Sequence, residues 1–288
     1  MRLPSRAIPR VHAPSPESFR RLHELPRLPV VITGALDGRA ATRTWSFEHL
    51  ATHGDVAVTV RVSRRGEAQL FDGNPGAAFE FRELPLRAAL AGLSEPNGEV
   101  WYVQHCDLRA VPVLHDEVGP LVYASRAART ESKLWVCGAG TKNPLHWDTH
   151  HAALAQMAGE KRFVLFPPED SPKLASFTHR TLWRTTGLDL SAVDRSRFPR
   201  VDDASAWSCT VQPGEVLFVP YGWWHYMECD APTISVTWWW PPSFSAHVRD
   251  SLRERLSTWV KRGLRAVRLE EGRSRGPTKA SPRSPPSG

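Results

Sequence analysis

The chain has 288 residues, of which 41% are hydrophobic and 12 are tryptophan, and its formal net charge is +7. This composition supports one enzyme-sized domain with a sizeable core, and the lack of any run of 18 apolar residues excludes a predicted membrane span. Four cysteines without a CxxC pair fit buried thiols better than a disulfide framework or a zinc site. The basic N-terminus is not followed by an apolar segment of the secretory type, so we expect a cytoplasmic protein.

The positive charge is concentrated at the two ends of the chain. Lys and Arg exceed Asp and Glu by about 4 in residues 1–28, about 5 in 247–269 and about 2 in 270–288, whereas residues 29–246 carry about −4. A nucleic-acid interface needs a basic patch, usually interleaved with aromatic side chains. The central body offers none, so solvated surface charge is favoured over nucleic-acid binding.

Taken in chain order, the elements are mostly short strands. Helices are expected over residues 16–23, with Ser15 as N-cap and proline at the first helical position, and over 46–53 and 85–93. Runs rich in β-branched and aromatic residues predict strands at 30–33, 56–62, 99–103, 133–137, 163–166, 215–219 and 233–239. Many short strands with helices outside predict a mainly β fold, a double-stranded β-helix or jelly-roll barrel whose mouth holds the ligand.

Three further segments complete the organisation. Residues 170–212 have a low apolar density and are predicted to form a long insertion that shapes a substrate cleft. Apolar residues recur at three- and four-residue steps over 246–269, which predicts an amphipathic C-terminal helix. Residues 270–288 are rich in Ser, Pro, Arg and Gly and are expected to be disordered. The remaining residues, 1–245, are predicted to form one domain.

The tripeptide His146-Trp147-Asp148 has the spacing of two ligands of one metal ion. A strand places residues i and i+2 on one face, so His146 and Asp148 can point at one ion while Trp147 faces away. The third ligand is His225, which closes the apolar run that begins at Val216. Two histidines and one carboxylate on one side of a metal leave the opposite positions open, the arrangement that suits non-haem Fe(II).

The segments around these residues resemble the JmjC and cupin-like 2-oxoglutarate dioxygenases, a group that includes the asparaginyl hydroxylase of hypoxia-inducible factor. In that family a strand carries HxD, a second strand follows a Gly-x-Lys-Arg turn, and a third ends in Trp-Trp-His. This chain has His146 and Asp148, then Gly159-Glu-Lys-Arg162, then Trp223-Trp-His225. The resemblance extends over about residues 8–245 and implies Fe(II), 2-oxoglutarate and O2 as cofactor and co-substrates.

The resemblance also implies which residues bind the co-substrate. Lys161 matches the family lysine that binds the distal carboxylate of 2-oxoglutarate, where a charge-assisted hydrogen bond can form. By the same alignment Tyr102 and Asn143 would donate hydrogen bonds to that carboxylate. Thr237 would lie near the iron-bound end. Two of these positions depart from the asparaginyl hydroxylase, which has threonine at the position of Asn143 and asparagine at that of Thr237.

The family therefore implies an oxygenase, and hydroxylation of an amino-acid side chain in a protein or peptide is the favoured reaction. Hydroxylation of a modified tRNA base or a small metabolite, and a metal-binding cupin-like barrel without turnover, stay open as alternatives. Relatives imply a homodimer through helix 246–269; packing of this helix on its own barrel or on an anionic membrane surface is less favoured. His150 and His151 are assigned to substrate contact or solvation, and Trp223 and Trp224 to barrel packing.

Overall fold

The structure is a computed structural model that describes residues 3–64, 79–93, 98–124, 131–174 and 184–243. The chain divides into two compact units, residues 1–241 and 242–288, and the fold described below is that of the first. The predicted helix over 246–269 and the predicted tail over 270–288 lie outside the described residues. Within the described part of the chain, no helix is long and apolar enough to cross a membrane.

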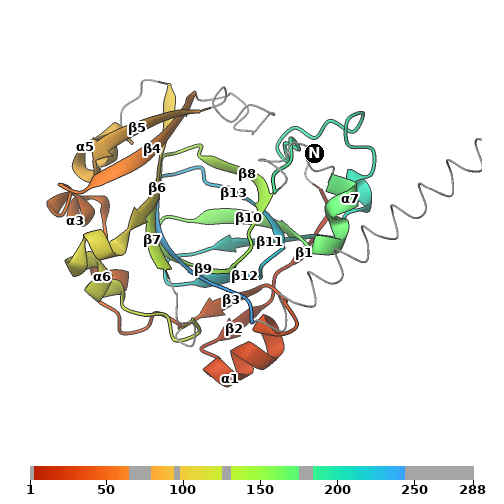
Figure 1. Cartoon of the computed structure of the whole chain (residues 1–288), viewed down its shortest axis with the longest axis horizontal. Coiled ribbons are helices and arrows are strands. Elements are labelled where there is room, and N and C mark those ends of the chain that lie inside the picture. Colours follow the sequence, from red (N-terminus) through yellow and green to blue (C-terminus); the bar gives the residue numbers. More distant parts are fainter. Residues whose placement is uncertain (1–2, 65–78, 94–97, 125–130, 175–183, 244–288) are drawn as a thin grey trace, which may run out of the picture. The chain divides into compact units, whose positions relative to one another are not determined.

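The described strands form two sheets (Figure 1). The smaller sheet contains, in spatial order, β1 (Ser5–Ala7), β11 (Ala206–Val211), β10 (Lys161–Phe166), β13 (Trp224–Glu228) and β8 (Lys142–Trp147). The larger sheet contains, in spatial order, β2 (Arg10–His12), β3 (Val30–Thr33), β12 (Val216–Val219), β9 (His151–Ala158), β14 (Thr233–Trp240), β7 (Glu131–Cys137), β6 (Glu99–Asp107), β4 (Ala57–Arg64) and β5 (Glu80–Pro85).

Strands β7 to β14 alternate between the two sheets, apart from β10 and β11, which are neighbours in the smaller one. The larger sheet holds β12, β9, β14 and β7 side by side, and the smaller sheet holds β11, β10, β13 and β8. This pairing of eight antiparallel strands is a jelly roll, as the sequence predicts. The barrel interior is filled by buried side chains from both sheets, which include Val31, Tyr102, Trp135, Phe163, Leu165 and Leu217.

Helices lie outside the strands. The first is α1 (Pro16–Phe19), which continues as the π-helical turn η1 (Arg20–Glu24); Ser15 caps it by accepting a hydrogen bond from the amide of Ser18, as predicted. The others are α2 (Ala41–Thr44), α3 (Phe47–Thr52), α5 (Leu86–Gly92), η2 (Leu108–Ala110), α6 (Pro112–Val118), η3 (Pro168–Asp170), α7 (Ser171–Leu174) and η4 (Val201–Asp203). In Figure 1, α3 and α5 flank the end of the larger sheet that carries β4 and β5.

Three sequence-based expectations need correction. His225 does not close the strand that begins at Val216, because a turn at residues 220–223 separates β12 from β13, and His225 is the second residue of β13. Strand β9 was missed, because its run of alanines lacks the β-branched residues that signal a strand. The predicted insertion 170–212 is shorter than expected, because its last residues form β11, a strand of the barrel.

All four cysteines are buried free thiols, as the composition indicates.

Candidate metal centre and its cavity

Two adjacent antiparallel strands bring the three predicted metal ligands together. β8 pairs with β13 so that His146 lies directly opposite His225, and their ring centroids are 4.1 Å apart. Asp148 follows β8 by one residue, and its Oδ2 lies 3.8 Å from Nε2 of His225. One potential ligand atom of each residue lies within 4.8 Å of the other two, a spacing that fits a single metal ion.

Main-chain carbonyls orient both imidazoles. Nδ1 of His146 lies 2.7 Å from the carbonyl oxygen of Pro144, and Nδ1 of His225 lies 3.0 Å from that of Trp223. A carbonyl oxygen can only accept, so each Nδ1 carries the proton and donates it. Nε2 of each ring therefore keeps its lone pair free for a metal, which is how metal-binding histidines are commonly held.

The protonation states also suit metal binding. Burial and the neighbouring His225 lower the pKa of His146 to about 4, so this ring is neutral at pH 7. Burial alone would raise the pKa of Asp148, but the histidine pair and a hydrogen bond from Trp239 outweigh it and lower the pKa. The centre thus presents the neutral imidazole of His146 and the carboxylate of Asp148 at neutral pH, and both can coordinate a divalent ion in this form.

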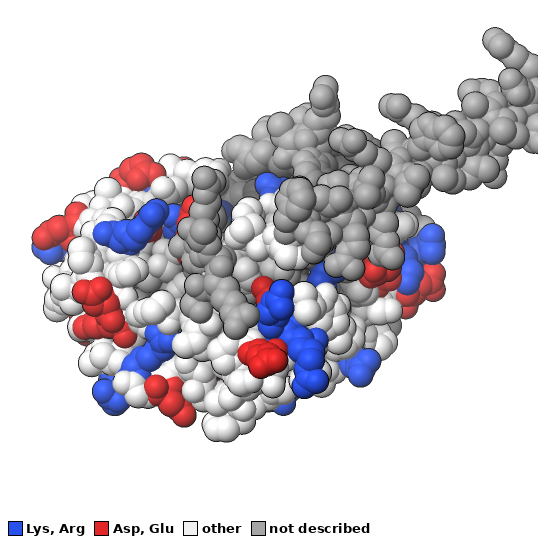
Figure 2. Space-filling model, turned by 60° about the horizontal axis from the view of Figure 1, so that its bottom comes forward, with Lys and Arg blue, Asp and Glu red and all other residues white. Residues whose placement is uncertain are grey.

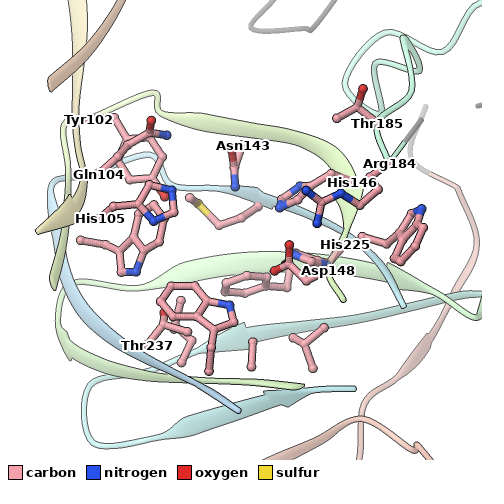
Figure 3. A pocket seen from close by; sticks show the side chains of 18 residues that line it. Tyr102, Gln104, His105, Asn143, His146, Asp148, Arg184, Thr185, His225 and Thr237 are labelled. Carbon is pink, nitrogen blue, oxygen red and sulfur yellow. The ribbon is translucent and has the colours of Figure 1, made fainter. Parts of the chain in front are cut away.

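The three residues line one wall of a cavity of about 410 Å³ (Figure 3). Its lining is formed by Tyr102, Gln104, His105, Trp135, Asn143, His146, Trp147, Asp148, Ala152, Leu154, Phe163, Arg184, Thr185, Val219, His225, Met227, Thr237 and Trp239. Tyr102, Gln104 and His105 lie at one end, and Arg184 and Thr185 lie at the other, beyond His146. Trp147 was expected to face away from the metal centre. It packs against the hydrophobic cluster that contains Leu145, and it also lines part of the cavity.

Of the four residues expected to bind the co-substrate, Tyr102, Asn143 and Thr237 line the cavity. Asn143 is held by the buried Arg61, whose Nη1 lies 3.4 Å from Oδ1 of Asn143 and whose Nη2 donates to the carbonyl oxygen of Lys142 at 2.6 Å. Arginine only donates hydrogen bonds, so this contact keeps Oδ1 of Asn143 outward. The amide nitrogen of Asn143 consequently points into the cavity (Figure 3), as a hydrogen-bond donor should.

Lys161 is fully buried but is not among the residues that line the cavity. Its Nζ donates to Oγ of Ser235 at 2.6 Å. Its charge also lowers the pKa of the buried Cys137 thiol. Burial alone would raise this pKa, but a hydrogen bond from Cys229 and the nearby ammonium of Lys161 outweigh burial and lower the pKa to about 6. Cys137 lies opposite Tyr102 across β7 and β6, so Lys161 lies at the Tyr102 end of the barrel, behind the cavity wall.

Three contributions to the cavity and its support were not predicted from the sequence. Between Val103 and Cys106, β6 has one residue more than the paired segment of β7. This extra residue forms a β-bulge, so the consecutive residues Gln104 and His105 both line the cavity. His105 takes a left-handed backbone conformation there, with φ 54°, and its ring packs on Trp135. Arg184 comes from the insertion, which has no periodic pattern. Arg61 leaves one signal, a cation within a β-branched run.

The remaining tryptophan and histidine expectations are also resolved. Trp223 and Trp224 are buried and pack outside the cavity, with indole hydrogen bonds to the carbonyl oxygen of Arg27 and to Oγ of Ser171. His150 is exposed and does not line the cavity, which fits solvation. His151 is buried among Phe218, Tyr221 and Trp240 instead of contacting solvent or substrate.

The jelly roll and its HxD…H centre are those of a cupin-like protein. The cupin-like domain family matches residues 16–246, and the chain belongs to this family. The chain is 30% identical over 240 residues to lysine-specific demethylase 8 of Xenopus tropicalis, covering 81% of this chain and 53% of that protein. It is 29% identical over 228 residues to lysine-specific demethylase JMJ30 of Arabidopsis thaliana, covering 78% of this chain and 52% of that protein.

A human relative is matched over most of its own length. The bifunctional peptidase and (3S)-lysyl hydroxylase JMJD7 is 27% identical over 257 residues, which cover 79% of this chain and 81% of that protein. By contrast, this chain spans about half the length of the demethylase 8 and JMJ30 proteins. The match to the cupin-like family confirms the family resemblance inferred from the HxD…H core.

Proposed function

We propose that the protein is an Fe(II)- and 2-oxoglutarate-dependent oxygenase that hydroxylates an amino-acid side chain of a protein or peptide and releases succinate and CO2. The observation that carries the proposal is the centre of His146, Asp148 and His225, whose ligand atoms lie within 4.8 Å of one another. Both imidazoles have their Nδ1 protons engaged by carbonyl groups, so both Nε2 atoms are available. Two histidines and one carboxylate suit Fe(II) that handles oxygen.

The residues that line the cavity have different roles in the proposed reaction. His146, Asp148 and His225 would hold the iron. With 2-oxoglutarate and O2, bound Fe(II) would supply the oxidising power to insert one oxygen atom of O2 into a C–H bond. The other oxygen atom would be incorporated into succinate. The aromatic walls, which include the buried Trp135 and Phe163 and the partly buried Trp239, would keep bulk water away from the reacting carbon.

The co-substrate would lie between the metal centre and the Tyr102 end of the cavity. Tyr102 and the amide nitrogen of Asn143 would donate hydrogen bonds to its distal carboxylate, and Thr237 would lie nearer the metal-bound end. Lys161 would supply the positive charge that attracts the distal carboxylate. The ammonium group of Lys161 donates to Ser235, so it would act in one of two ways. It would either leave Ser235 and donate to the distal carboxylate, or attract this carboxylate electrostatically from behind the cavity wall.

A second reaction is favoured by the names of two relatives, which are called lysine-specific demethylases. Hydroxylation of an N-methyl carbon gives an unstable product that breaks down to the amine and formaldehyde, so the same centre could serve demethylation. Formaldehyde release separates the two reactions, because C-hydroxylation yields succinate without formaldehyde. We favour hydroxylation, which is named for the human lysyl hydroxylase, the relative matched over 81% of its length.

The test begins with metal binding in the absence of oxygen. Wild-type protein should bind one Fe(II) per chain and develop a visible charge-transfer band when 2-oxoglutarate is added. His146→Ala and His225→Ala should each lose both properties. His150→Ala is the matched control, since this exposed histidine lies outside the cavity, and it should retain them. Wild-type iron affinity in both His146→Ala and His225→Ala would show that the metal assignment is wrong.

Substrate class is tested by succinate release with peptide and tRNA pools at two salt concentrations. Peptide-stimulated turnover with a modest salt dependence is expected, because the central body of the chain, residues 29–246, carries a net charge of about −4. Binding to tRNA releases counterions and weakens steeply as salt rises. Turnover that is stimulated only by tRNA and is lost at high salt would replace the peptide proposal.

A further inference from the structure

Two of the four buried cysteines are in contact behind the Tyr102 end of the cavity. Cys137 is the last residue of β7 in the larger sheet, and Cys229 directly follows β13 in the smaller sheet. A hydrogen bond joins their side chains, and both residues belong to the hydrophobic cluster that fills the barrel interior. The pair therefore lies where the ends of two strands from different sheets meet.

Main-chain hydrogen bonds hold Cys229 against the turn that follows Cys137. The amide of Cys229 donates to the carbonyl oxygen of Thr141 at 3.0 Å, and its own carbonyl oxygen accepts from the amide of Gly140 at 2.9 Å. Sγ of Cys229 lies 3.6 Å from the carbonyl oxygen of Gly138, to which it donates. A carbonyl oxygen can only accept, so Cys229 is the protonated member of the pair. The backbone thus fixes the pair and leaves Cys137 as the thiol that can lose its proton.

Cys137 is the most acidic of the four thiols. Burial would raise its pKa, but the hydrogen bond from Cys229 and the ammonium of Lys161 outweigh burial, and the pKa lies at about 6. In contrast, burial raises the pKa of Cys106 to about 11 and that of Cys209 to about 12. The hydrogen bond to Cys137, together with burial, raises the pKa of Cys229. Because the thiolate is the nucleophilic form of cysteine, Cys137 would be the first of the four to react with an oxidant.

We propose that Cys137 and Cys229 are a modification site at which hydrogen peroxide forms a reversible disulfide. The pair needs neither a metal nor the co-substrate for this reaction. Sγ of the Cys137 thiolate attacks one oxygen of the peroxide, the O–O bond breaks and hydroxide leaves, so that Cys137 becomes a sulfenic acid. Sγ of Cys229 then attacks the sulfenic sulfur, the S–O bond breaks, and this oxygen leaves as water with the proton of Cys229. The two sulfurs together lose two electrons, which the peroxide gains.

Burial restricts which oxidants can reach the pair. Cys137 is fully buried, and the exposed fraction of Cys229 is 3%. The cavity approaches both thiols, because Tyr102 lies opposite Cys137 in the pairing of β6 with β7, and Met227, two residues before Cys229, also lines the cavity. Hydrogen peroxide is close to water in size, whereas glutathione disulfide is a much larger peptide. We therefore expect the peroxide to oxidise the pair and glutathione disulfide to leave it reduced.

The test uses the full-length, Zn(II)-loaded protein, because Zn(II) is not redox-active. Hydrogen peroxide is added and then removed with catalase, the remaining thiols are alkylated in denaturant, and mass spectrometry identifies cross-linked peptides. We expect a Cys137–Cys229 cross-link in most wild-type molecules, and dithiothreitol should remove it. Cys229→Ser should prevent the cross-link and leave a sulfenic acid on Cys137 that dimedone labels during denaturation. Cys209→Ser is the matched control, because it removes a buried thiol outside the pair, and it should keep the cross-link.

Thermal unfolding gives a second readout. A disulfide between these two residues closes a long loop and constrains the unfolded chain, so the melting temperature of oxidised wild-type protein should rise by several degrees. Absence of the cross-link in peroxide-treated wild-type protein would overturn the proposal. A cross-link that lowers the melting temperature would do so as well, because the thiols could then be joined only by distorting the barrel. Equal oxidation by glutathione disulfide would show that the thiols react only in an opened protein, which also contradicts the proposal.

Discussion

Buried polar side chains around Tyr102 link the co-substrate end of the cavity to the rest of the barrel. The guanidinium of Arg61 lies over the Tyr102 ring, 4.9 Å from its centroid, and over the ring of Phe79 at 4.3 Å. Burial lowers the pKa of Arg61 to about 10, which leaves it charged at neutral pH. The same residue fixes the amide of Asn143. Arg61 is therefore a positioning residue for two predicted co-substrate donors.

Lys161→Met should raise the 2-oxoglutarate requirement about ten- to a hundred-fold and leave Fe(II) binding nearly unchanged, because it removes a charged hydrogen-bond donor from the Tyr102 end. Succinate release at increasing 2-oxoglutarate, together with Fe(II) titration, measures both quantities. Ser235→Ala, which removes the partner of Lys161 but keeps the cation, should have a small effect. An unchanged requirement in Lys161→Met, with a large increase in Arg61→Lys, would move the anchor to Arg61.

His151 makes stability depend on pH. Burial first, and then the charges of Arg27 and His150, lower its pKa to about 3, whereas an unfolded histidine titrates near 6.5. Between these two values the unfolded chain binds a proton that the folded chain does not. Each unit of pH lost below 6.5 should therefore reduce the free energy of unfolding by about 1.4 kcal/mol from this residue.

Replacing His151 with asparagine keeps an acceptor for the amide of Tyr221 and removes the titration. Urea unfolding of the His151→Asn variant should show a shallower loss of stability between pH 6.5 and 4 than wild type. His150→Asn, at an exposed neighbouring position, should keep the wild-type slope. Parallel slopes for wild type and His151→Asn would contradict this prediction.

At the level of elements, the turn between β9 and β10 places Lys161. Gly159 has φ 66°, and a Cβ atom there would lie 2.5 Å from the carbonyl oxygen of Pro232. Gly214, in another turn, has φ 87°, and a Cβ atom there would meet nothing within 4 Å. The two glycines thus share the left-handed backbone but differ in the space around them.

Gly214→Ala should cost about 1–2 kcal/mol, the penalty of a left-handed residue with a side chain. Gly159→Ala should cost clearly more, because backbone atoms must move as well. Thermal or urea unfolding of the two variants gives the difference. Equal losses of stability would show that the turn relaxes without cost, and Lys161 would then be less firmly placed than the structure indicates.

The sequence predicts elements where local pattern and tertiary structure agree. The i, i+2 spacing of His146 and Asp148 identifies the centre because an extended chain places such residues on one face, although Asp148 follows the last residue of β8. The cavity wall depends on non-local features instead. One additional residue in β6 lets Gln104 and His105 both line the cavity, and only the pairing with β7 reveals it. Strand β11 was assigned to the insertion for the same reason, since its pairing partner β10 lies some forty residues earlier.

At the scale of the whole molecule, the described surface mixes charges of both signs. On the face seen in Figure 2, Lys and Arg side chains are interspersed with Asp and Glu. Among the described residues, ion pairs join Arg195 with Asp202 and Arg82 with Glu99. The basic excess of the sequence lies at the ends of the chain, and the described barrel surface gives no reason to prefer nucleic acid over peptide as a partner.

We propose that residues 246–269, with their apolar stripe, form a homodimer interface. Replacing Leu256 and Val260 with glutamate should convert a dimer to a monomer, because two charges in an apolar interface are costly to bury. Light scattering measures the oligomeric state, and circular dichroism checks that the barrel stays folded. A wild-type protein that is monomeric at high concentration would contradict the homodimer proposal.

Residues 184–186 pair with the edge strand β8, and this attachment has an evolutionary consequence. Two of the interactions that fix this segment are main-chain hydrogen bonds, from the amide of Trp147 to the carbonyl oxygen of Arg184 and from the amide of Thr186 to that of Leu145. Neither bond depends on side-chain identity, so the residue at position 184 can change while both bonds remain. The strands that carry the metal centre need not change when the wall does. Related proteins could thus acquire new substrates by varying one short segment. Chimaeras that exchange residues 184–188 between relatives test whether this segment influences substrate preference.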